Sequence, residues 1–270
     1  MAVAITPRNI DFDLPEDLPR HWHGGDPYVT SFFNGLSLMF PDGEKFFVDS
    51  VRRYQKEITD PELLEQVRGF CGQEGMHGRE HRRYNELLER QGYPVRAIDR
   101  FLQWGIRQDR KLPPKVQLAM TVALEHFTAV FADIVLRDPR MFRDAHPAMR
   151  RLWTWHALEE AEHKAVAFDV YRTVAPGFGG WLRRVLVMLW VTVGFLLQIV
   201  IHESWLQRSE GTFWHWRARR RAFRYFFGEP GLLRAGLWHY LAFYRPSFHP
   251  WQIDSGDVVE RWRAEYAVSA

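Results

Sequence analysis

The sequence has almost no cysteine, no strong excess of charge of one sign and no apolar stretch near its first residue. Its one cysteine, Cys71, cannot form an internal disulfide, which argues against a secreted scaffold and against a cysteine-built zinc site. Lysine and arginine number 36 against 33 aspartates and glutamates, and this balance argues against a nucleic-acid binder. Acidic residues and prolines occupy positions where a signal peptide needs an apolar segment, so we expect a cytoplasmic protein.

The sequence also lacks the motifs of several large enzyme classes. The glycines of residues 177–180 have neither the lysine of a phosphate-binding loop nor a preceding strand. No serine nucleophile elbow and no His-Glu-x-x-His run of the zincin kind occurs. ATP-dependent and nicotinamide-dependent chemistry are therefore disfavoured, and any electrons that catalysis needs have to come from the substrate or from a separate protein.

Apolar residues recur at helical spacing along almost the whole chain, and no series of alternating strand patterns interrupts them. This pattern predicts an all-α protein whose first part is a helical bundle. Prolines and capping residues mark the starts of most helices. The predicted helices cover residues 28–39, a helix opened by Pro41, and residues 61–92, 98–108, 115–136 and 147–176.

The last third of the chain differs in composition, since ten of the 12 tryptophans lie at or beyond Trp153. Residues 185–201 are almost entirely apolar. They span only about 25 Å as a helix and are fewer than the ~20 residues that a membrane-crossing helix needs. In residues 213–227 arginines alternate with aromatic side chains, as in segments that lie among lipid headgroups. The alternatives are packing on the bundle or on a second subunit, and membrane contact through residues 181–227.

Two Glu-x-x-His pairs, Glu74 with His77 and Glu160 with His163, are the most informative motif. Residues three positions apart lie on the same helix face, so a carboxylate and an imidazole at this spacing share a metal ion or bridge two. About one such pair is expected by chance in a chain of this composition. Two pairs, each inside a long predicted helix, make a metal site the better interpretation.

Three further residues extend this pattern. Glu44 lies in the first turn of its predicted helix, and Glu125 lies among apolar neighbours in the helix between the pairs. His156 precedes Glu160 by four residues and shares a helix face with it. Four buried carboxylates without partners are costly, and two divalent cations neutralise them. This mixture of carboxylate and imidazole suits two Fe ions, with Mn or Zn as alternatives.

The order Glu, Glu-x-x-His, Glu, Glu-x-x-His resembles the ferritin-like di-iron carboxylate proteins, in which those six positions bind the metals. This resemblance implies a ferritin-like bundle with the metal ligands Glu44, Glu74, His77, Glu125, Glu160 and His163. The added His156 is similar to a histidine of the p-aminobenzoate N-oxygenase group, di-iron enzymes that oxidise arylamines with O2. That likeness implies a seventh ligand, and a hydrogen bond that orients another ligand is the alternative role.

A second resemblance covers nearly the whole chain. Four segments look like a bacterial family of predicted metal-dependent hydrolases: residues 7–12 (PRNIDF), 22–27 (WHGGDP), 40–47 (FPDGEKFF) and 73–77 (QEGMH). This resemblance implies metal dependence and names hydrolysis as the reaction.

The patterns divide the chain into three predicted parts. Residues 1–26 form an irregular lead-in, residues 27–176 form the ferritin-like metal-binding bundle, and residues 177–270 form a helical extension rich in aromatic side chains.

We therefore expect a metal-dependent enzyme, and the leading interpretation is a non-haem di-iron oxygenase or oxidase that activates O2. A dinuclear metal-dependent hydrolase and non-enzymatic handling of metal or oxidant are the alternatives. The expected partners are a small apolar or aromatic substrate, O2 and a separate electron donor. Peripheral membrane contact and a homodimer are left open, and no nucleic acid is expected.

Several titratable residues beside the motif are expected to stay outside the metal site. His126 directly follows Glu125 and so points about 100° away around the helix. His81 follows His77 by four residues and lines the same face, where metal binding is the weaker alternative. The acids expected to be solvated are Glu80, Glu159 and Glu162.

Overall fold

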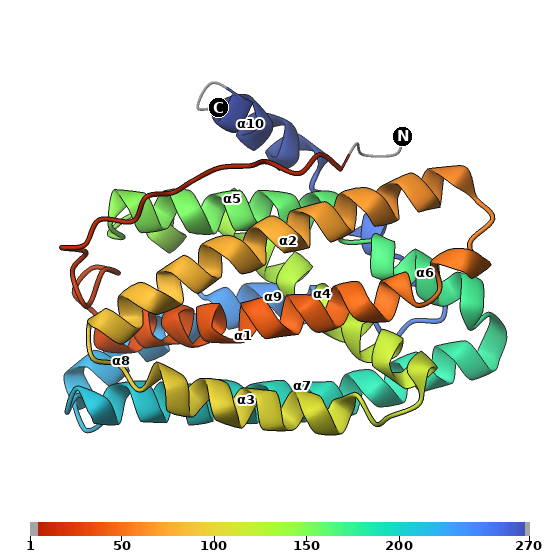
Figure 1. Ribbon diagram of the computed structural model, residues 1–270. Helices are drawn as coiled ribbons and strands as arrows, with labels where there is room; N and C mark the ends of the chain where they lie inside the picture. Colours follow the sequence, from red (N-terminus) through yellow and green to blue (C-terminus); the bar gives the residue numbers. More distant parts are fainter. Residues whose placement is uncertain (1–4, 268–270) are drawn as a thin grey trace.

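The structure, a computed structural model, describes residues 5–267. It consists of helices packed along one another, and no β-strand occurs within these residues (Figure 1). The all-α prediction is confirmed. The first four residues of the predicted lead-in and the last three of the predicted extension lie outside the described range, and the division into three parts stays a prediction.

Four long helices form the centre of the molecule and bring distant parts of the sequence together. Helix α1 packs along α2, helix α4 packs along α5, and α2 meets α5. Their bounds are Pro27–Arg52 for α1, Pro61–Arg90 for α2, Pro114–Arg137 for α4 and Pro147–His163 for α5.

Aspartate caps fix the starts of the first two of these helices. The Asp26 side chain accepts hydrogen bonds from the backbone N–H groups of Tyr28 and Val29, and Asp60 accepts one from Glu62. A proline follows each cap at the first helical position, where its missing N–H has no helical partner to lose. Local sequence therefore determines where α1 and α2 begin.

The predicted break at Pro41 is wrong, because α1 continues through this proline. Proline lacks the N–H that would bond to the carbonyl of Ser37, one turn earlier. The Asn85 side chain of α2 donates to that carbonyl at 3.0 Å, so the neighbouring helix satisfies the free acceptor. Local periodicity does not contain this contact, which joins residues 48 positions apart.

The predicted helix over residues 147–176 is also wrong in one respect, because it is interrupted. Helix α5 ends at His163, and α6 (Val166–Val174) follows. At the interruption the buried Lys164 side chain donates hydrogen bonds to the Ile253 carbonyl and the Ser255 hydroxyl. A tertiary contact from the end of the chain thus coincides with the break.

The remaining helices surround this centre. Helix α7 packs against α1 and α4, and α3 packs against α1 (Figure 1). Their bounds are Val95–Asp109 for α3, Gly177–Ser209 for α7, Trp216–Phe227 for α8, Leu232–Ala242 for α9 and Gly256–Ala267 for α10. Short 3-10 helices cover Gln55–Glu57, Pro139–Phe142 and Pro250–Gln252.

Helices α4 and α7 are long and apolar enough to cross a membrane, judged by length and composition alone. The apolar window of α4 is 78% buried, as in the core helix of a soluble protein, whereas that of α7 is only 22% buried. The 33 residues of α7 correct the expectation that the apolar segment is too short to span a bilayer. Two such helices are weak support for a membrane protein, and they leave the cytoplasmic expectation open.

Candidate metal centre

The seven predicted ligands meet in the middle of the four-helix centre, and none is more than 4% exposed. Helix α1 contributes one of them, α2 two, α4 one and α5 three. They are Glu44, then Glu74 and His77, then Glu125, and finally His156, Glu160 and His163.

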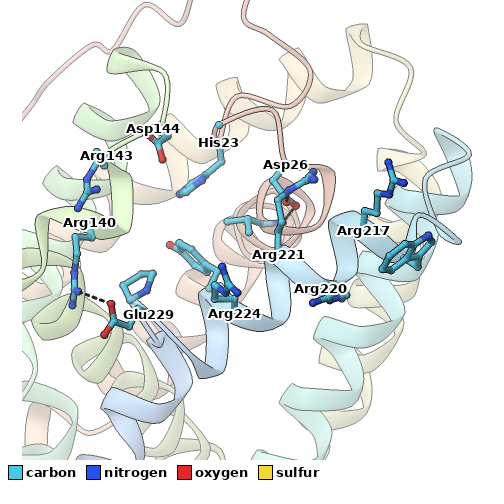
Figure 2. A pocket seen from close by; sticks show the side chains of 15 residues that line it. His23, Asp26, Arg140, Arg143, Asp144, Arg217, Arg220, Arg221, Arg224 and Glu229 are labelled. Carbon is cyan, nitrogen blue, oxygen red and sulfur yellow. Dashed lines mark hydrogen bonds and ion pairs between the residues drawn. The ribbon is translucent and has the colours of Figure 1, made fainter.

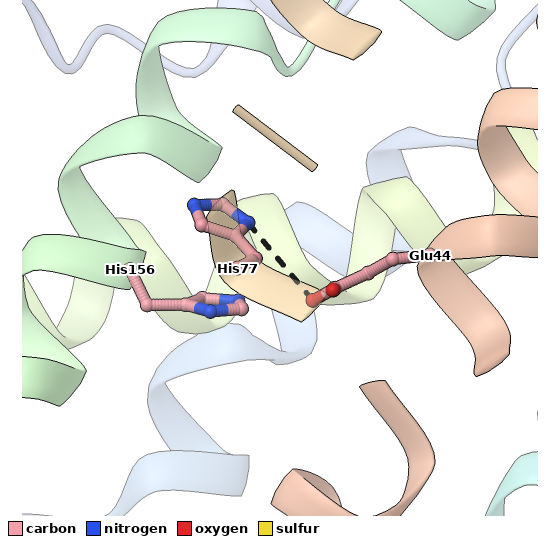
Figure 3. Close-up of side chains that lie close together, drawn as sticks. All are labelled: Glu44, His77 and His156. Atoms are coloured by element: carbon pink, nitrogen blue, oxygen red, sulfur yellow. Dashed lines mark ion pairs between the residues drawn. The ribbon is translucent and has the colours of Figure 1, made fainter. Parts of the chain in front are cut away.

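His77 lies at the junction of three carboxylates. Its Nδ1 atom is 3.9 Å from Oε1 of Glu44, 3.8 Å from Oε2 of Glu74 and 3.6 Å from Oε1 of Glu160. Figure 3 shows Glu44 reaching toward His77, with the His156 ring beside it. Ligand atoms of Glu44, His77 and His156 all lie within 4.8 Å of one another, as a shared metal ion requires.

His163 lies at a second junction. Its Nε2 atom is 3.4 Å from Oε1 of Glu74, 3.6 Å from Oε2 of Glu125 and 3.5 Å from Oε2 of Glu160. Glu74, Glu125 and His163 form another group within 4.8 Å. Glu74 and Glu160 each approach both His77 and His163, so these two carboxylates lie between the two groups.

Many of these buried polar atoms have no hydrogen-bond partner within the described residues. Both oxygens of Glu44, Glu74 and Glu125 lack one, as do both nitrogens of His77. Burying an unpaired polar atom costs about 1–3 kcal/mol, and more for a charged group. Oxygen and imidazole nitrogen atoms are common ligands of divalent cations, so the residues present fit a metal site.

Electrostatics leads to the same conclusion. Burial and the nearby carboxylates raise the pKa of Glu44 and of Glu74 well above its ordinary value. Burial and repulsion by Glu160 raise the pKa of Glu125 to about 8. Burial and the adjacent His156 lower the pKa of His77 well below its ordinary value, which keeps the imidazole neutral. A cation nearby lowers the pKa of the carboxylates and so favours their ionised form. Neutral imidazole is the form that binds metal.

A chain of hydrogen bonds orients His156. The Ser37 hydroxyl donates to Oδ1 of Asn85 at 2.8 Å, and the same oxygen of Ser37 lies 2.9 Å from Nδ1 of His81. Ser37 therefore accepts from His81, whose Nε2 then accepts from Nδ1 of His156 at 3.0 Å. In a neutral His156 ring, this order of donors leaves the Nε2 lone pair 3.2 Å from a Glu160 oxygen. Two lone pairs that face each other repel, and a cation relieves that repulsion.

A neighbouring residue orients His163, and a further carboxylate approaches His77. Nδ1 of His163 donates to Oε1 of Gln73 at 2.9 Å, which leaves its Nε2 facing the carboxylates. Nε2 of His77 lies 3.2 Å from Oε2 of Glu159. The sequence predicted no role for Gln73 and a solvated position for Glu159, because no spacing rule links either residue to the motif. His81, by contrast, shared the helix face of His77, and that spacing was the available signal.

The expectation that Glu80, Glu159 and Glu162 are solvated is wrong, since each is at most 1% exposed. Arg8 of the lead-in forms ion pairs with Glu159 at 3.2 Å and with Glu162 at 2.7 Å. Arg79 and Arg83 pair with Glu80. The lead-in covers these acids, a tertiary contact that helix periodicity does not reveal. His126 points away from the centre as predicted, and its Nε2 lies 3.1 Å from the His239 carbonyl oxygen.

A hollow of about 760 Å³ lies apart from the Glu/His centre, and none of the seven predicted ligands lines it. Figure 2 shows arginines from α8 around it, together with Arg140, Arg143 and three acids. Its lining contains one histidine, His23, which belongs to none of the three-residue groups of possible metal ligands found among the described residues. The Glu/His centre is therefore the better candidate for metal chemistry.

Comparison with known proteins gives one match. A family model described as "Predicted metal-dependent hydrolase" matches residues 6–254. A search of curated proteins and a search of solved structures found no match. The leading interpretation from sequence, a di-iron oxygenase or oxidase, is therefore wrong, and the hydrolase alternative fits. Carboxylate and imidazole spacing specifies a metal site but not the reaction that the metal promotes.

Proposed function

The chain belongs to the family of predicted metal-dependent hydrolases, so it is a metal-dependent enzyme, and we propose that its Glu/His centre binds two divalent cations and hydrolyses a substrate held beside them. The observation that carries this proposal is the cluster of buried carboxylate and imidazole atoms that have no hydrogen bond to any described residue. Its four carboxylates match the charge of two divalent cations.

The arrangement of Glu74 and Glu160 supports two cations over one. One oxygen of Glu74 approaches His77 and the other approaches His163. Glu160 divides its oxygens between the same two histidines. Each carboxylate thus offers one oxygen to each group, which is how a bridging carboxylate binds. Glu44 lies beside His77 and Glu125 beside His163, so each would hold one cation.

Divalent cations supply Lewis acidity, which polarises the bond to be cleaved and acidifies water. The chain itself holds the ligands and keeps the centre dry. Aromatic rings enclose the three histidines: Phe40 stacks on His156 at 4.6 Å, while Trp155 and Phe70 meet His77 and His163 edge-on at 4.9 and 5.0 Å. Excluding bulk water strengthens every charge interaction inside the centre.

The test combines metal analysis with activity. Protein purified without added metal should contain about two equivalents of a divalent metal per chain. A chelator should abolish hydrolysis of the best substrate in a panel of chromogenic esters, amides and phosphates, and Zn, Mn or Fe(II), each added under nitrogen, should restore it and identify the metal. Hydrolysis that persists after complete metal removal, or one metal per chain at full activity, contradicts the proposal.

A further inference from the structure

A chiefly apolar cavity of about 310 Å³ lies between α1, α3, α4 and α7. Leucine, methionine, phenylalanine, isoleucine, valine and tryptophan make up most of its wall. Glu44 also lines it, and both oxygens of that carboxylate lack hydrogen bonds. Its volume falls at the lower end of the ~300–1,000 Å³ range of small-molecule sites. The cavity is therefore an apolar chamber that reaches one edge of the Glu/His centre.

A second hollow of about 40 Å³ reaches the same centre from α1, α4 and α5. His156 and Glu160 line it. Four residues line both hollows and form an apolar partition between them: Leu36, Phe40, Thr128 and Phe131. Both sides of this partition thus adjoin predicted metal ligands.

Three helical glycines keep the larger cavity open. Gly43, Gly105 and Gly194 line it, and a Cβ atom built at any of them meets no atom within 4 Å. Glycine within a helix is about 1 kcal/mol less favourable than alanine. Close helix packing does not require these glycines, because the space beside them is open. Their shared consequence is cavity volume.

The larger cavity opens on the outer side of α7. Trp190 and Gly194 line it and are also exposed to solvent. The residues that line the cavity thus extend from the exposed surface of α7 to Glu44.

We propose that this cavity binds an aliphatic chain of the substrate and holds the bond to be cleaved at its Glu44 end. The position of the bond to be cleaved rests on the proposed function, whereas binding of the aliphatic chain in the cavity does not. A strongly polar chain would lose its hydration here and find few partners, since besides Glu44 the carboxyl, hydroxyl and amide groups of the lining belong to Asp109, Thr128 and Gln198. For a carboxylic ester, hydrolysis breaks the acyl C–O bond, water oxygen joins the acyl carbon, and the alcohol leaves with a proton.

The first test measures binding without reaction. Calorimetric titration of 1-decanol into the purified protein should show saturable binding with a negative heat-capacity change, and ethanol should not bind. Gly105→Leu and Gly194→Leu place a side chain in open space and should each raise the Kd for decanol at least tenfold without lowering Tm. Gly179→Leu is the matched control, since Gly179 also lies in α7 with open space beside it but does not line the cavity.

The second test uses p-nitrophenyl esters from acetate to decanoate. The native protein should show higher kcat/KM for the longer esters, and both leucine variants should shift the preference toward acetate. Binding of decanol that the leucine variants weaken, with no hydrolysis of any ester, would refute the proposed function and leave chain binding intact. Absence of decanol binding, or binding that neither leucine variant changes, overturns the chain-binding proposal even for an active hydrolase.

A separate observation concerns the outer face of α7, which carries a continuous apolar surface. Its side chains recur every three or four residues over about 27 Å of helix. They are 39% to 59% exposed and none is charged; they include Leu182, Leu186, Leu189, Val193, Leu197 and Val200. Apolar surfaces of this extent mark contacts with another protein or with a membrane.

Helix α8 adds positive charge close to this surface in the sequence. Trp216, Arg220 and Phe223 lie on one exposed face at four- and three-residue spacing. All five arginines of α8 are exposed, and the helix has no acidic residue. Figure 2 shows four of them around the hollow of about 760 Å³.

We infer that α7 and α8 bind the surface of an anionic lipid bilayer. Each arginine near such a surface contributes roughly 1 kcal/mol, and aromatic side chains suit the headgroup layer. An anionic bilayer accounts for both the apolar face of α7 and the arginines of α8, whereas a dimer through α7 accounts only for the apolar face. Charge therefore favours lipid over a second copy of the chain.

Vesicle flotation tests this inference. The protein should float with phosphatidylcholine vesicles that contain phosphatidylglycerol at low salt, and not with pure phosphatidylcholine. Leu189→Glu and Arg220→Glu should each reduce the floated fraction at least fivefold, whereas Arg150→Glu, the same charge change on an exposed position of α5, should not. No flotation with anionic vesicles, or a dimer without lipid that Leu189→Glu dissociates, overturns the lipid assignment.

Discussion

Two sets of buried acids meet on α5: Glu159 with Glu162, and the acids of the Glu/His centre, to which Glu160 belongs. The two sets have different partners. Glu159 and Glu162 pair with Arg8, an arginine of the same chain. Glu160, between them in sequence, faces the centre, where it meets histidines and other carboxylates but no lysine or arginine within the described residues. Burial is the same within 3% exposure, so the difference lies in the partner.

This difference distinguishes acids whose counter-charge is part of the fold from acids whose counter-charge would come from a bound ligand. A buried acid that pairs with an arginine of its own chain has a counter-charge without any ligand, and removing that arginine would leave a buried charge unpaired. In the centre, burial raises the pKa of Glu44, Glu74 and Glu125, while Glu160, against the effect of burial, raises the pKa of His163 to about 9. Bound cations would add the positive charge that these residues themselves supply only through His163. Gln73 connects the two sets, because it donates to Glu162 at 2.7 Å and accepts from His163 at 2.9 Å.

Removing a central acid should have the largest effect. Glu74→Ala should lose most of the bound metal and at least 100-fold in kcat, because both groups of ligands use this carboxylate. Helix content by circular dichroism should stay unchanged, since apolar packing holds the bundle together. Glu65→Ala on the same helix, whose side chain is 74% exposed, is the control. Full metal content in Glu74→Ala would show that the ligand set is wrong.

Cutting the link between the two sets should have an intermediate effect. Gln73→Leu removes the acceptor that orients His163, and such losses typically weaken metal binding about 10- to 100-fold. Competition with a chromophoric chelator measures this affinity, with Gln66→Leu on the same helix as the control. Unchanged affinity would mean that Gln73 serves the fold alone.

Removing the chain's own counter-charge should affect stability and spare the metal. Arg8→Ala leaves Glu159 without its arginine and should lower the free energy of unfolding by about 3 kcal/mol, measured with urea. Arg68→Ala breaks an exposed pair and should cost less than about 1 kcal/mol. Metal loss in Arg8→Ala, with stability unchanged, would contradict this prediction and show that Arg8 supports metal binding rather than the fold.

An uncharged contact should show the smallest effect. Asn85→Ala leaves the Ser37 carbonyl without its donor and should cost about 1 kcal/mol of stability. Replacing Pro41 with alanine in that variant supplies a backbone N–H and should recover part of the loss. A double-mutant cycle measures this coupling, and strictly additive effects would refute the explanation of the uninterrupted helix.

Short-range sequence signals predicted much of the molecule correctly. Apolar periodicity predicted helices throughout, including the start of α1 to within one residue, and aspartate followed by proline predicted the start of α2. The spacing within Glu74/His77 and Glu160/His163 placed each pair on one face, because three residues make nearly one turn of any helix. These features depend on geometry within a single helix, so the sequence determines them.

Only the tertiary structure decided the rest. Asn85 allows α1 to continue through Pro41, and Arg8 converts Glu159 and Glu162 from expected surface acids into buried ion pairs. The apolar cavity beside Glu44 exists because four helices meet around three glycines. Each of these features requires segments far apart in sequence to come together. Helix periodicity says which residues share a face, but packing determines what that face meets.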